Sequence, residues 1–121
     1  MDRLLSGRQV LVVEDEMLVL IMIEDMLADL GCESVTAAAT VDQALAAIDA
    51  QIFDVAMLDM NLNGSNSYAV AEALGTHGVP FVFSTGYSGH DMRDGYRDHP
   101  VLKKPFTEKE LAEVLTRLLS R

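Results

Sequence analysis

The sequence predicts one α/β domain, a doubly wound five-stranded parallel sheet in the order 2-1-3-4-5 with helices on both faces. Short β-rich runs alternate with helical segments along the 121 residues, which is typical of βα units. The first, third and fourth of these runs are continuously apolar, as strands buried on both faces require. Acids, hydroxyls and a lysine follow the strands at their carboxyl ends, where such folds bind ligands.

The first half of the chain contains two strands and two helices. Gln9–Val13 is a β-rich run, and Glu16–Leu30 is helical by its pattern. Gly31 follows, a residue suited to end a helix. Ser34–Ala37 is a brief second strand. The segment Thr40–Ala50 opens with the spacing of a capping box and predicts a second helix.

The second half continues the alternation. Pro80 stands at the first position of a predicted strand, where proline is tolerated. Gly75 is predicted to end a short helix. Thr107 and Glu110 have the spacing of a second capping box. The segment Gly89–His99 offers few apolar residues, so we expect a short or mobile helix there. The predicted strands are Asp54–Asp59, Pro80–Ser84 and Val101–Lys103, and the predicted helices are Tyr68–Leu74, Gly89–His99 and Thr107–Leu119.

Composition excludes several classes of protein. The net charge is −10, with nine basic residues against nineteen acids, which argues against direct nucleic-acid binding. The longest apolar run, Met17–Ile23, is far shorter than the roughly 20 residues of a membrane span. The N-terminus has no signal-peptide pattern, and the lone Cys32 fits a reducing compartment. We expect a soluble, cytoplasmic protein without an attached effector domain.

Chemistry-bearing residues follow the predicted strands. Glu14 and Asp15 follow the first strand, Asp59 ends the third, Thr85 follows the fourth and Lys104 follows the fifth. Carboxyl ends of parallel strands meet at one edge, so these side chains should converge. Three carboxylates close together repel one another, and a divalent cation removes the conflict. Hard oxygen ligands select Mg²⁺ or a similar ion.

A carboxylate beside Mg²⁺ can accept a phosphoryl group. Asp59 is the candidate acceptor, with Lys104 and Thr85 binding the remaining phosphoryl oxygens. Taken singly, an aspartate at a strand end is more often a turn former or helix cap. The joint occurrence of the acids, Thr85 and Lys104 at one edge favours the functional interpretation.

The chain resembles a response-regulator receiver domain, and the resemblance runs nearly end to end over residues 1–121. Each matching motif is weak alone, but four in order at these spacings are a specific signal. The motifs are Val12-Val13-Glu14-Asp15, Leu58-Asp59, Ser84-Thr85-Gly86 and Lys104-Pro105-Phe106. The resemblance implies a flavodoxin-like or CheY-like fold.

The resemblance also implies roles. Asp59 would accept phosphate from the phosphohistidine of a sensor histidine kinase or phosphotransfer protein. Glu14, Asp15 and Asp59, with the backbone carbonyl of Asn61, would hold Mg²⁺ or Mn²⁺. The hydroxyl of Thr85 would follow the phosphoryl group, and Lys104 would pair with it. The Lys104–Pro105 peptide bond would be cis, which is reasonable because proline follows.

The sequence departs from the receiver pattern near the switch. Receivers usually carry an aromatic residue three positions before the lysine, and Val101 stands there. Tyr87 is a candidate to take over part of that role. Asn61 and Tyr87 also occupy positions at which family members tune water access to the acyl phosphate, so both are expected to affect its lifetime.

The first helix has more apolar residues than one core face needs. Its expected core positions are Val19, Met22, Ile23, Met26, Leu27 and Leu30. Four residues are surplus, namely Met17, Leu18, Leu20 and Ile21. Exposed apolar clusters mark interfaces, and histidine kinases contact receivers largely through this helix. We therefore expect the four to form a partner-docking surface, although packing on a loop or on a second copy is the alternative.

These observations predict a stand-alone receiver in two-component signalling, acting as a phosphorylation switch or phosphate sink through protein contacts. It would be no enzyme beyond slow self-dephosphorylation, and a monomer or weak homodimer. An aspartyl-phosphate phosphatase is one alternative, but its second acid would be Asn61, which cannot transfer a proton. A flavin or nucleotide carrier would need a phosphate-binding loop after the first strand. A docking module that is never phosphorylated is the third alternative.

Overall fold

The sheet has five parallel strands in the order β2-β1-β3-β6-β7, as predicted. The computed structural model describes residues 4–62, 65–86 and 99–120. The strands of this sheet are β1 (Gln9–Val13), β2 (Ser34–Ala38), β3 (Val55–Asp59), β6 (Phe81–Thr85) and β7 (Val101–Lys103). Each lies within one residue of its predicted bounds. The periodicity and turn signals were therefore sufficient to place the sheet.

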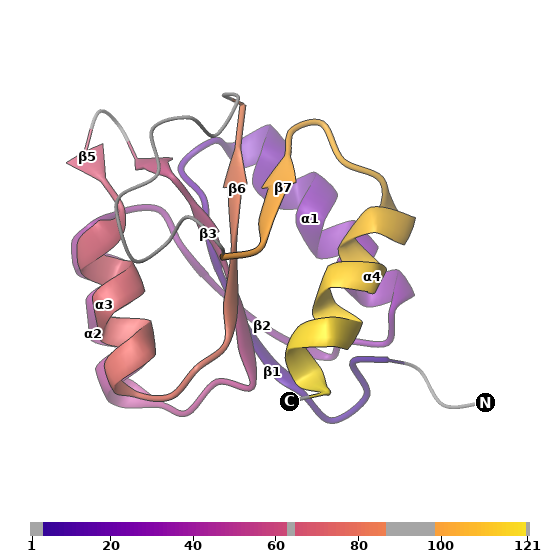
Figure 1. Ribbon diagram of the computed structural model, residues 1–121, viewed down its shortest axis with the longest axis horizontal. Helices are drawn as coiled ribbons and strands as arrows, with labels where there is room; N and C mark the ends of the chain where they lie inside the picture. Colours follow the sequence, from indigo (N-terminus) through magenta and orange to yellow (C-terminus); the bar gives the residue numbers. More distant parts are fainter. Residues whose placement is uncertain (1–3, 63–64, 87–98, 121) are drawn as a thin grey trace.

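Helices cover both faces of the sheet (Figure 1). They are α1 (Met17–Asp29), α2 (Val41–Ala50), α3 (Tyr68–Thr76) and α4 (Glu108–Leu119). Helices α1 and α4 lie on one face and α2 and α3 on the other, which follows from right-handed crossovers in both directions from the central strands. No helix among the described residues is long and apolar enough to cross a membrane.

Alternate residues of the central strands build two separate cores. On β1, Leu11 and Val13 pack against α2 and α3, whereas Val10 and Val12 pack against α1 and α4. All four side chains are completely buried. Successive side chains of a strand point to opposite faces, so a strand covered on both sides must be apolar at every position.

Helix ends agree with the predicted caps, with two exceptions. Thr107 and Glu110 form the complete capping box, whereas Thr40 accepts from the Gln43 N–H without the reciprocal bond. The predicted end of α3 at Gly75 is wrong, because the helix continues to Thr76. The turn is made instead at Gly78, which adopts a φ of 71° that favours glycine.

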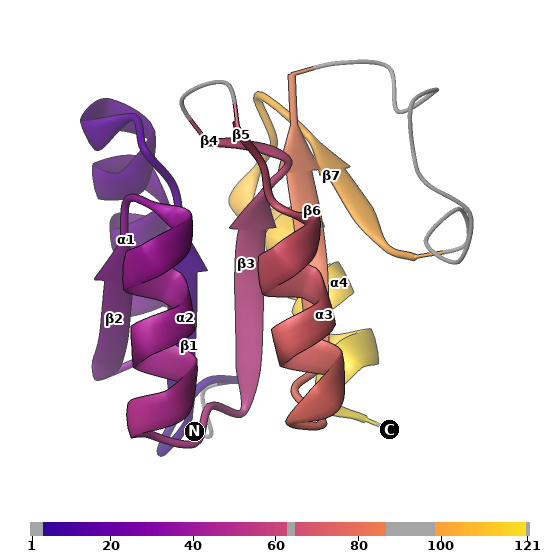
Figure 2. The ribbon, with the colours of Figure 1, turned by 90° about the vertical axis from the view of Figure 1, so that its left-hand side faces the viewer.

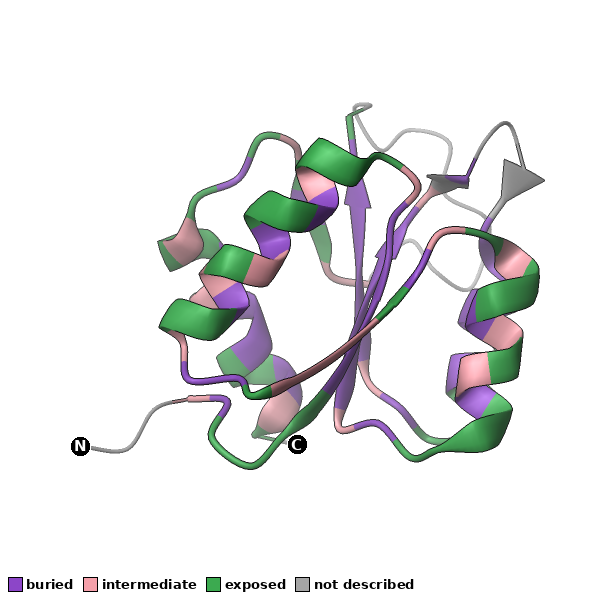
Figure 3. Ribbon diagram, turned by 180° about the vertical axis from the view of Figure 1, so that it is seen from behind, coloured by how far each residue is buried: buried purple, intermediate pink, exposed green. Residues whose placement is uncertain are grey.

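The core stripe of α1 differs from the predicted one. Leu20 was expected to be surplus, but it is buried together with Ile23 and Leu27. Met22 was expected in the core and is exposed. Residues three and four apart share one helix face, and the stripe that faces the sheet contains Leu20 rather than Met22. Green exposed segments mark the outward side of the helix in Figure 3.

A short antiparallel hairpin follows β3 and was not predicted. Its strands are β4 (Asn61–Leu62) and β5 (Ser65–Asn66). The hairpin lies beside the carboxyl ends of β3 and β6 (Figure 2). The helix predicted over residues 89–99 lies outside the described residues except for its last position, and so does Tyr87.

Candidate functional site at the carboxyl ends of the strands

The fold places the predicted site residues at the carboxyl ends of the strands, and Figure 2 shows these strand ends together at one end of the sheet. Glu14 and Asp15 follow the last residue of β1, and Asp59 is the last residue of β3. Thr85 ends β6, and Lys104 follows the last residue of β7. Because all these strands are parallel and in register, their carboxyl ends bring the five residues to the same edge.

Three carboxylates are gathered at this edge. Glu14 and Asp59 are buried, Glu14 with only 1% of its surface exposed, and Asp15 is half-buried. One carboxylate oxygen from each residue lies within 4.8 Å of the other two. Carboxylate oxygens at this spacing suit a hard divalent cation such as Mg²⁺. The donor set therefore fits the predicted metal.

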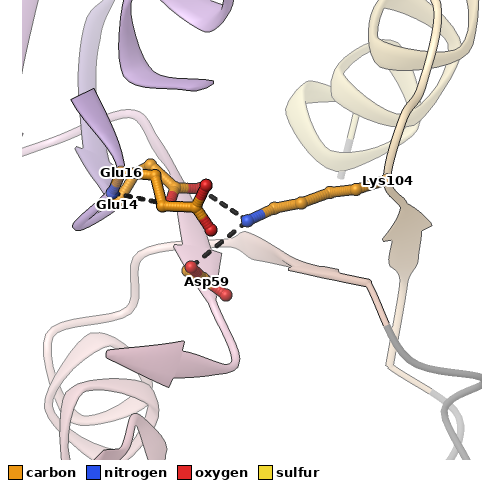
Figure 4. Close-up of polar contacts among 4 residues, drawn as sticks. All are labelled: Glu14, Glu16, Asp59 and Lys104. Carbon is orange, nitrogen blue, oxygen red and sulfur yellow. Dashed lines mark hydrogen bonds and ion pairs between the residues drawn. The ribbon is translucent and has the colours of Figure 1, made fainter. Parts of the chain in front are cut away.

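Lys104 reaches into the cluster from β7 (Figure 4). Its Nζ donates to Glu14 Oε1 at 2.8 Å and to Asp59 Oδ2 at 3.2 Å. Burial lowers the pKa of Lys104, but the hydrogen bond to Glu14 and the negative charges of Asp59 and Glu14 outweigh burial, so the pKa is raised overall. The side chain therefore carries its positive charge throughout the neutral pH range.

Glu14 is held by both of its carboxylate oxygens. Oε1 accepts from Lys104, and Oε2 accepts from the backbone N–H of Glu16 at 3.1 Å. The backbone N–H of Glu14 donates to the carbonyl of Ala38 at 2.9 Å. The contribution of Glu16 was not predicted, although its position just before α1 could have suggested a backbone donor, since the first N–H groups of a helix lack intrahelical partners.

Thr85 and Lys104 are joined through the backbone. The Lys104 N–H donates to the Thr85 carbonyl at 2.7 Å, and Thr85 pairs with Lys103 in the register of β6 and β7. Thr85 is buried. The Lys104–Pro105 bond is cis, which confirms that expectation. A hydroxyl and an ammonium thus come from neighbouring strands at the edge that carries the acids.

The remaining predicted residues divide into three groups. Asn61 begins β4, two residues after Asp59. The role of its backbone carbonyl as a metal ligand stays a prediction. The effects of Asn61 and Tyr87 on the lifetime of the acyl phosphate also stay predictions. Met17, Leu18 and Ile21 are exposed on α1, whose first turn directly follows Glu14 and Asp15. Leu20 is removed from the docking surface because it lies in the core.

Solved structures similar to this chain include receiver domains. SdrG from Sphingomonas melonis Fr1 is 44% identical, with a TM-score of 0.83, covering 96% of this chain and 98% of that one. The receiver domain of PhyR from Erythrobacter litoralis is 30% identical, with a TM-score of 0.82 and coverage of 95% and 92%.

A third similar structure contains a metal. It is the receiver domain of the sensor histidine kinase PA1611 from Pseudomonas aeruginosa PAO1, with a magnesium ion coordinated in the active-site cleft. This domain is 28% identical to the chain, with a TM-score of 0.79 and coverage of 96% of this chain and 100% of that one. No curated protein sequence gives a significant match.

The family model described as the response regulator receiver domain matches residues 10–116. The match includes every acid of the cluster, Thr85 and Lys104. The sheet order and the geometry of the strand ends agree with it. The chain therefore belongs to the family of response regulator receiver domains of two-component signalling.

Proposed function

We propose that this receiver accepts a phosphoryl group on Asp59 from the phosphohistidine of a sensor histidine kinase or phosphotransfer protein. The observation that carries the proposal is the position of Asp59, a buried carboxylate at the end of β3 with the Lys104 ammonium 3.2 Å away. Glu14 and Asp15 surround the same point. A nucleophile, a fixed positive charge and a set of hard oxygen ligands are the parts that phosphoryl transfer needs.

The reaction moves one phosphoryl group between two nucleophiles. A carboxylate oxygen of Asp59 attacks phosphorus, an O–P bond forms, and the N–P bond of the phosphohistidine breaks with its electron pair remaining on the imidazole nitrogen. Mg²⁺ held by Glu14, Asp15, Asp59 and the Asn61 carbonyl would offset negative charge on the transferring group. Lys104, which contacts Glu14 and Asp59, would contribute a second positive charge, and Thr85 would offer a hydroxyl to the product.

The phosphorylated form would act through protein contacts. The residues of the site position and stabilise a phosphoryl group, and we propose no catalytic turnover beyond slow hydrolysis of the acyl phosphate. Asn61 and Tyr87 are the residues proposed to set the rate of that hydrolysis. Single substitutions of either should change the phosphoryl lifetime, measured as decay of the phosphorylated protein in the presence of Mg²⁺.

The test of the acceptor uses a small-molecule donor. Incubation with acetyl phosphate and Mg²⁺ should add the mass of one phosphoryl group, and beryllofluoride should change the NMR spectrum. SdrG is known in a BeF3-activated conformation, which supports the choice of probe. The Asp59→Asn variant should show neither change. Asp49→Asn is the matched control, because Asp49 is an exposed carboxylate on α2.

Two results would contradict the proposal. One is a phosphoryl adduct that persists in Asp59→Asn, which would place the chemistry elsewhere. The other is a wild-type protein that stays unmodified with every donor, including phosphorylated kinase, in the presence of Mg²⁺ or Mn²⁺.

We further propose that the exposed apolar residues of α1 dock the phosphodonor protein. Leu18 is 80% exposed, and Met17 and Ile21 are exposed beside it. The surface lies at the start of α1, next to the acids. A partner bound there would bring its phosphohistidine to Asp59. Burial of these side chains on docking would supply favourable free energy.

Charge substitutions test the docking surface. Leu18→Glu should lower phosphotransfer from the kinase about tenfold or more and leave phosphorylation by acetyl phosphate unchanged. Ile52→Glu is the matched control, because Ile52 is 88% exposed but lies in the loop between α2 and β3, near the amino ends of the strands. Equal effects of the two substitutions would show that α1 has no special role.

A further inference from the structure

We propose that Met17 and Met22 are an oxidation site that controls the docking surface of α1. Conversion of these two thioethers to sulfoxides would make the surface polar and weaken its contact with the phosphodonor protein, while the acceptor site stays intact. The inference rests on the proposed function, because it concerns regulation of the same docking surface. It adds Met22 to that surface and assigns the two sulfur atoms a role of their own.

Four exposed apolar side chains form one patch on α1. Residues four apart are neighbours on a helix face, so Met17 lies beside Ile21, and Leu18 lies beside Met22. The exposed fractions are 67% and 45% in the first pair and 80% and 46% in the second. The buried stripe that packs on the sheet lies on the other side of the helix. Each pair therefore presents one thioether and one aliphatic side chain to solvent.

The other methionines among the described residues are less accessible. Met57 is 1% exposed, in the core beneath α1 and α4. Met26 and Met60 are partly buried, and each packs against a core cluster. Oxidation requires the oxidant to reach the sulfur atom. Within the part of the chain that the structure describes, Met17 and Met22 are therefore the methionines that react first.

The modification transfers one oxygen atom from hydrogen peroxide to sulfur. The sulfur lone pair attacks one peroxide oxygen, an S–O bond forms, the O–O bond breaks, and water leaves. Sulfur loses two electrons, and the peroxide gains them. The sulfoxide is polar, so its burial at an interface without a hydrogen-bond donor is unfavourable. Methionine sulfoxide reductases reverse the change, which makes the site a reversible switch.

Cys32 is another target of peroxide in this chain, but it is protected. Its side chain is buried, and that burial raises the pKa of the thiol. The thiolate is the form that oxidises readily, so the protonated thiol reacts slowly at neutral pH. A reductase for methionine sulfoxide distinguishes the two residues, because dithiothreitol without the enzyme recovers oxidised thiols only.

The test oxidises the receiver alone and then measures phosphotransfer. The protein is treated with hydrogen peroxide, the peroxide is removed, and peptide mass spectrometry locates the added oxygen. The phosphodonor is the autophosphorylated sensor kinase of the same organism that transfers fastest to untreated wild type. Met17 and Met22 should oxidise about tenfold or more faster than Met57. Their oxidation should lower phosphotransfer about fivefold or more and leave phosphorylation by acetyl phosphate unchanged.

Leucine substitutions separate the sulfur atoms from the apolar surface. Met17→Leu combined with Met22→Leu keeps apolar side chains of similar volume and removes both thioethers, so peroxide should no longer change the rate of phosphotransfer. Each protein is compared with its own untreated sample, because the substitutions themselves alter the surface. Met26→Leu is the matched control. It removes one thioether from a partly buried position of the same helix, and its rate should fall as much as that of wild type.

The expected loss of phosphotransfer should return to the untreated rate with the reductase. Full oxidation of Met17 and Met22 without a loss would overturn the proposal. A loss that persists in the double leucine variant, or that dithiothreitol alone reverses, would overturn it as well. An equal loss with acetyl phosphate would also do so, because the damage would then lie in the acceptor site.

The oxidation site and the proposed function fail in different ways. If untreated wild type accepts phosphate on Asp59 and oxidation of the two methionines changes nothing, the oxidation site is wrong and the proposed function stands. If untreated wild type accepts phosphate from no donor, the proposed function fails, and the oxidation site fails with it.

Discussion

The two ends of the sheet carry charged contacts of different kinds. At the carboxyl ends, Lys104 pairs with Glu14 and Asp59 at 2.8 and 3.2 Å, and the three side chains are 18%, 1% and 8% exposed. At the amino ends, Arg8 pairs with Asp54 at 3.6 Å, with side chains 43% and 36% exposed. A similar loose contact joins His77 Nε2 and Asp49 at 3.8 Å, and it is an ion pair only when the imidazole is protonated.

Exposure decides what each pair does for the molecule. Exposed ion pairs contribute roughly 0–1 kcal/mol because water and salt screen them. A buried pair is expensive to form, and removal of one partner leaves an uncompensated charge. The carboxyl ends therefore hold an arrangement that stability alone does not favour, which is typical of a functional site. The amino ends hold charges that the fold tolerates.

The largest expected effect is a difference in stability between loss of the buried Lys104 ion pairs and loss of the exposed Arg8–Asp54 ion pair. Without divalent cation, Lys104→Met should lower the free energy of unfolding by ~2–3 kcal/mol, somewhat below the usual cost of breaking a buried pair because the lysine is partly exposed. Arg8→Met should lower it by less than about 1 kcal/mol. Urea denaturation of both variants in cation-free buffer measures the difference.

Mg²⁺ and salt sharpen this comparison. Added Mg²⁺ should reduce the deficit of Lys104→Met, because the cation replaces the missing charge, and should leave that of Arg8→Met unchanged. High NaCl should remove most of the small Arg8 effect through screening. Equal losses in the two variants, with the same response to salt, would show that burial does not distinguish the two ends.

A smaller effect is expected from relief of repulsion within the cluster. Asp15 adds a third carboxylate beside Glu14 and Asp59, so Asp15→Asn should raise the free energy of unfolding by roughly 1 kcal/mol without a cation. It should also abolish stabilisation by Mg²⁺. In wild type that stabilisation is about 1.4 kcal/mol at a concentration ten times the Kd.

Thermal unfolding with and without Mg²⁺ checks both parts of this prediction. Asp42→Asn, at an exposed acid in the first turn of α2, is the control and should leave the Mg²⁺ response intact. A destabilised Asp15→Asn protein would mean that Asp15 serves the fold, for example as a turn former. An Asp15→Asn protein that keeps the full Mg²⁺ response would remove Asp15 from the metal site.

The contrast between the two ends also shows what the sequence could reveal about the site. Apolar runs that end in Glu14 or Asp59 identify strands and their carboxyl ends, and parallel topology then brings the acids together. The pairing partners of Lys104 were not predictable in the same way. A long side chain can reach several acids, and its choice depends on distances between strands that pattern does not encode. The same limit applies to the backbone donor at Glu16.

The fold was predicted best where the sequence pattern of a whole segment is compatible with only one kind of element. Continuous apolar runs fixed the strands, whereas α1 is apolar on most sides, so its pattern did not define which stripe faces the sheet. The apolar pattern allows either Leu20 or Met22 to face the sheet. Packing against β1 and β3 buries Leu20 and leaves Met22 exposed. The hairpin of β4 and β5 has two-residue strands, too short to show any period. The prediction that α3 ends at Gly75 was wrong because tertiary packing outweighs the low helix propensity of glycine at that position, and the helix continues to Thr76.

The smallest expected effect concerns like charges on the surface. The protonated carboxyl of Glu108, at the start of α4, is stabilised by a side-chain hydrogen bond to Asp29 in the last turn of α1, and this interaction raises the pKa of Glu108. A raised pKa in the folded state favours folding below the ordinary pKa of 4.5, and that contribution is lost as the pH rises. At neutral pH the two carboxylates therefore repel, and Asp29 is also unfavourable at a helix C-terminus.

Asp29→Asn should accordingly raise the midpoint of thermal unfolding at neutral pH, by about 1 °C because the site is exposed. The gain should vanish as the pH falls below the raised pKa of Glu108, where protonation of Glu108 already relieves the repulsion. Asp25→Asn, at an exposed acid one turn earlier on α1, controls for net charge and the helix dipole. A gain in Asp29→Asn no larger than in this control, or one that persists at low pH, would show that the contact with Glu108 has no energetic consequence.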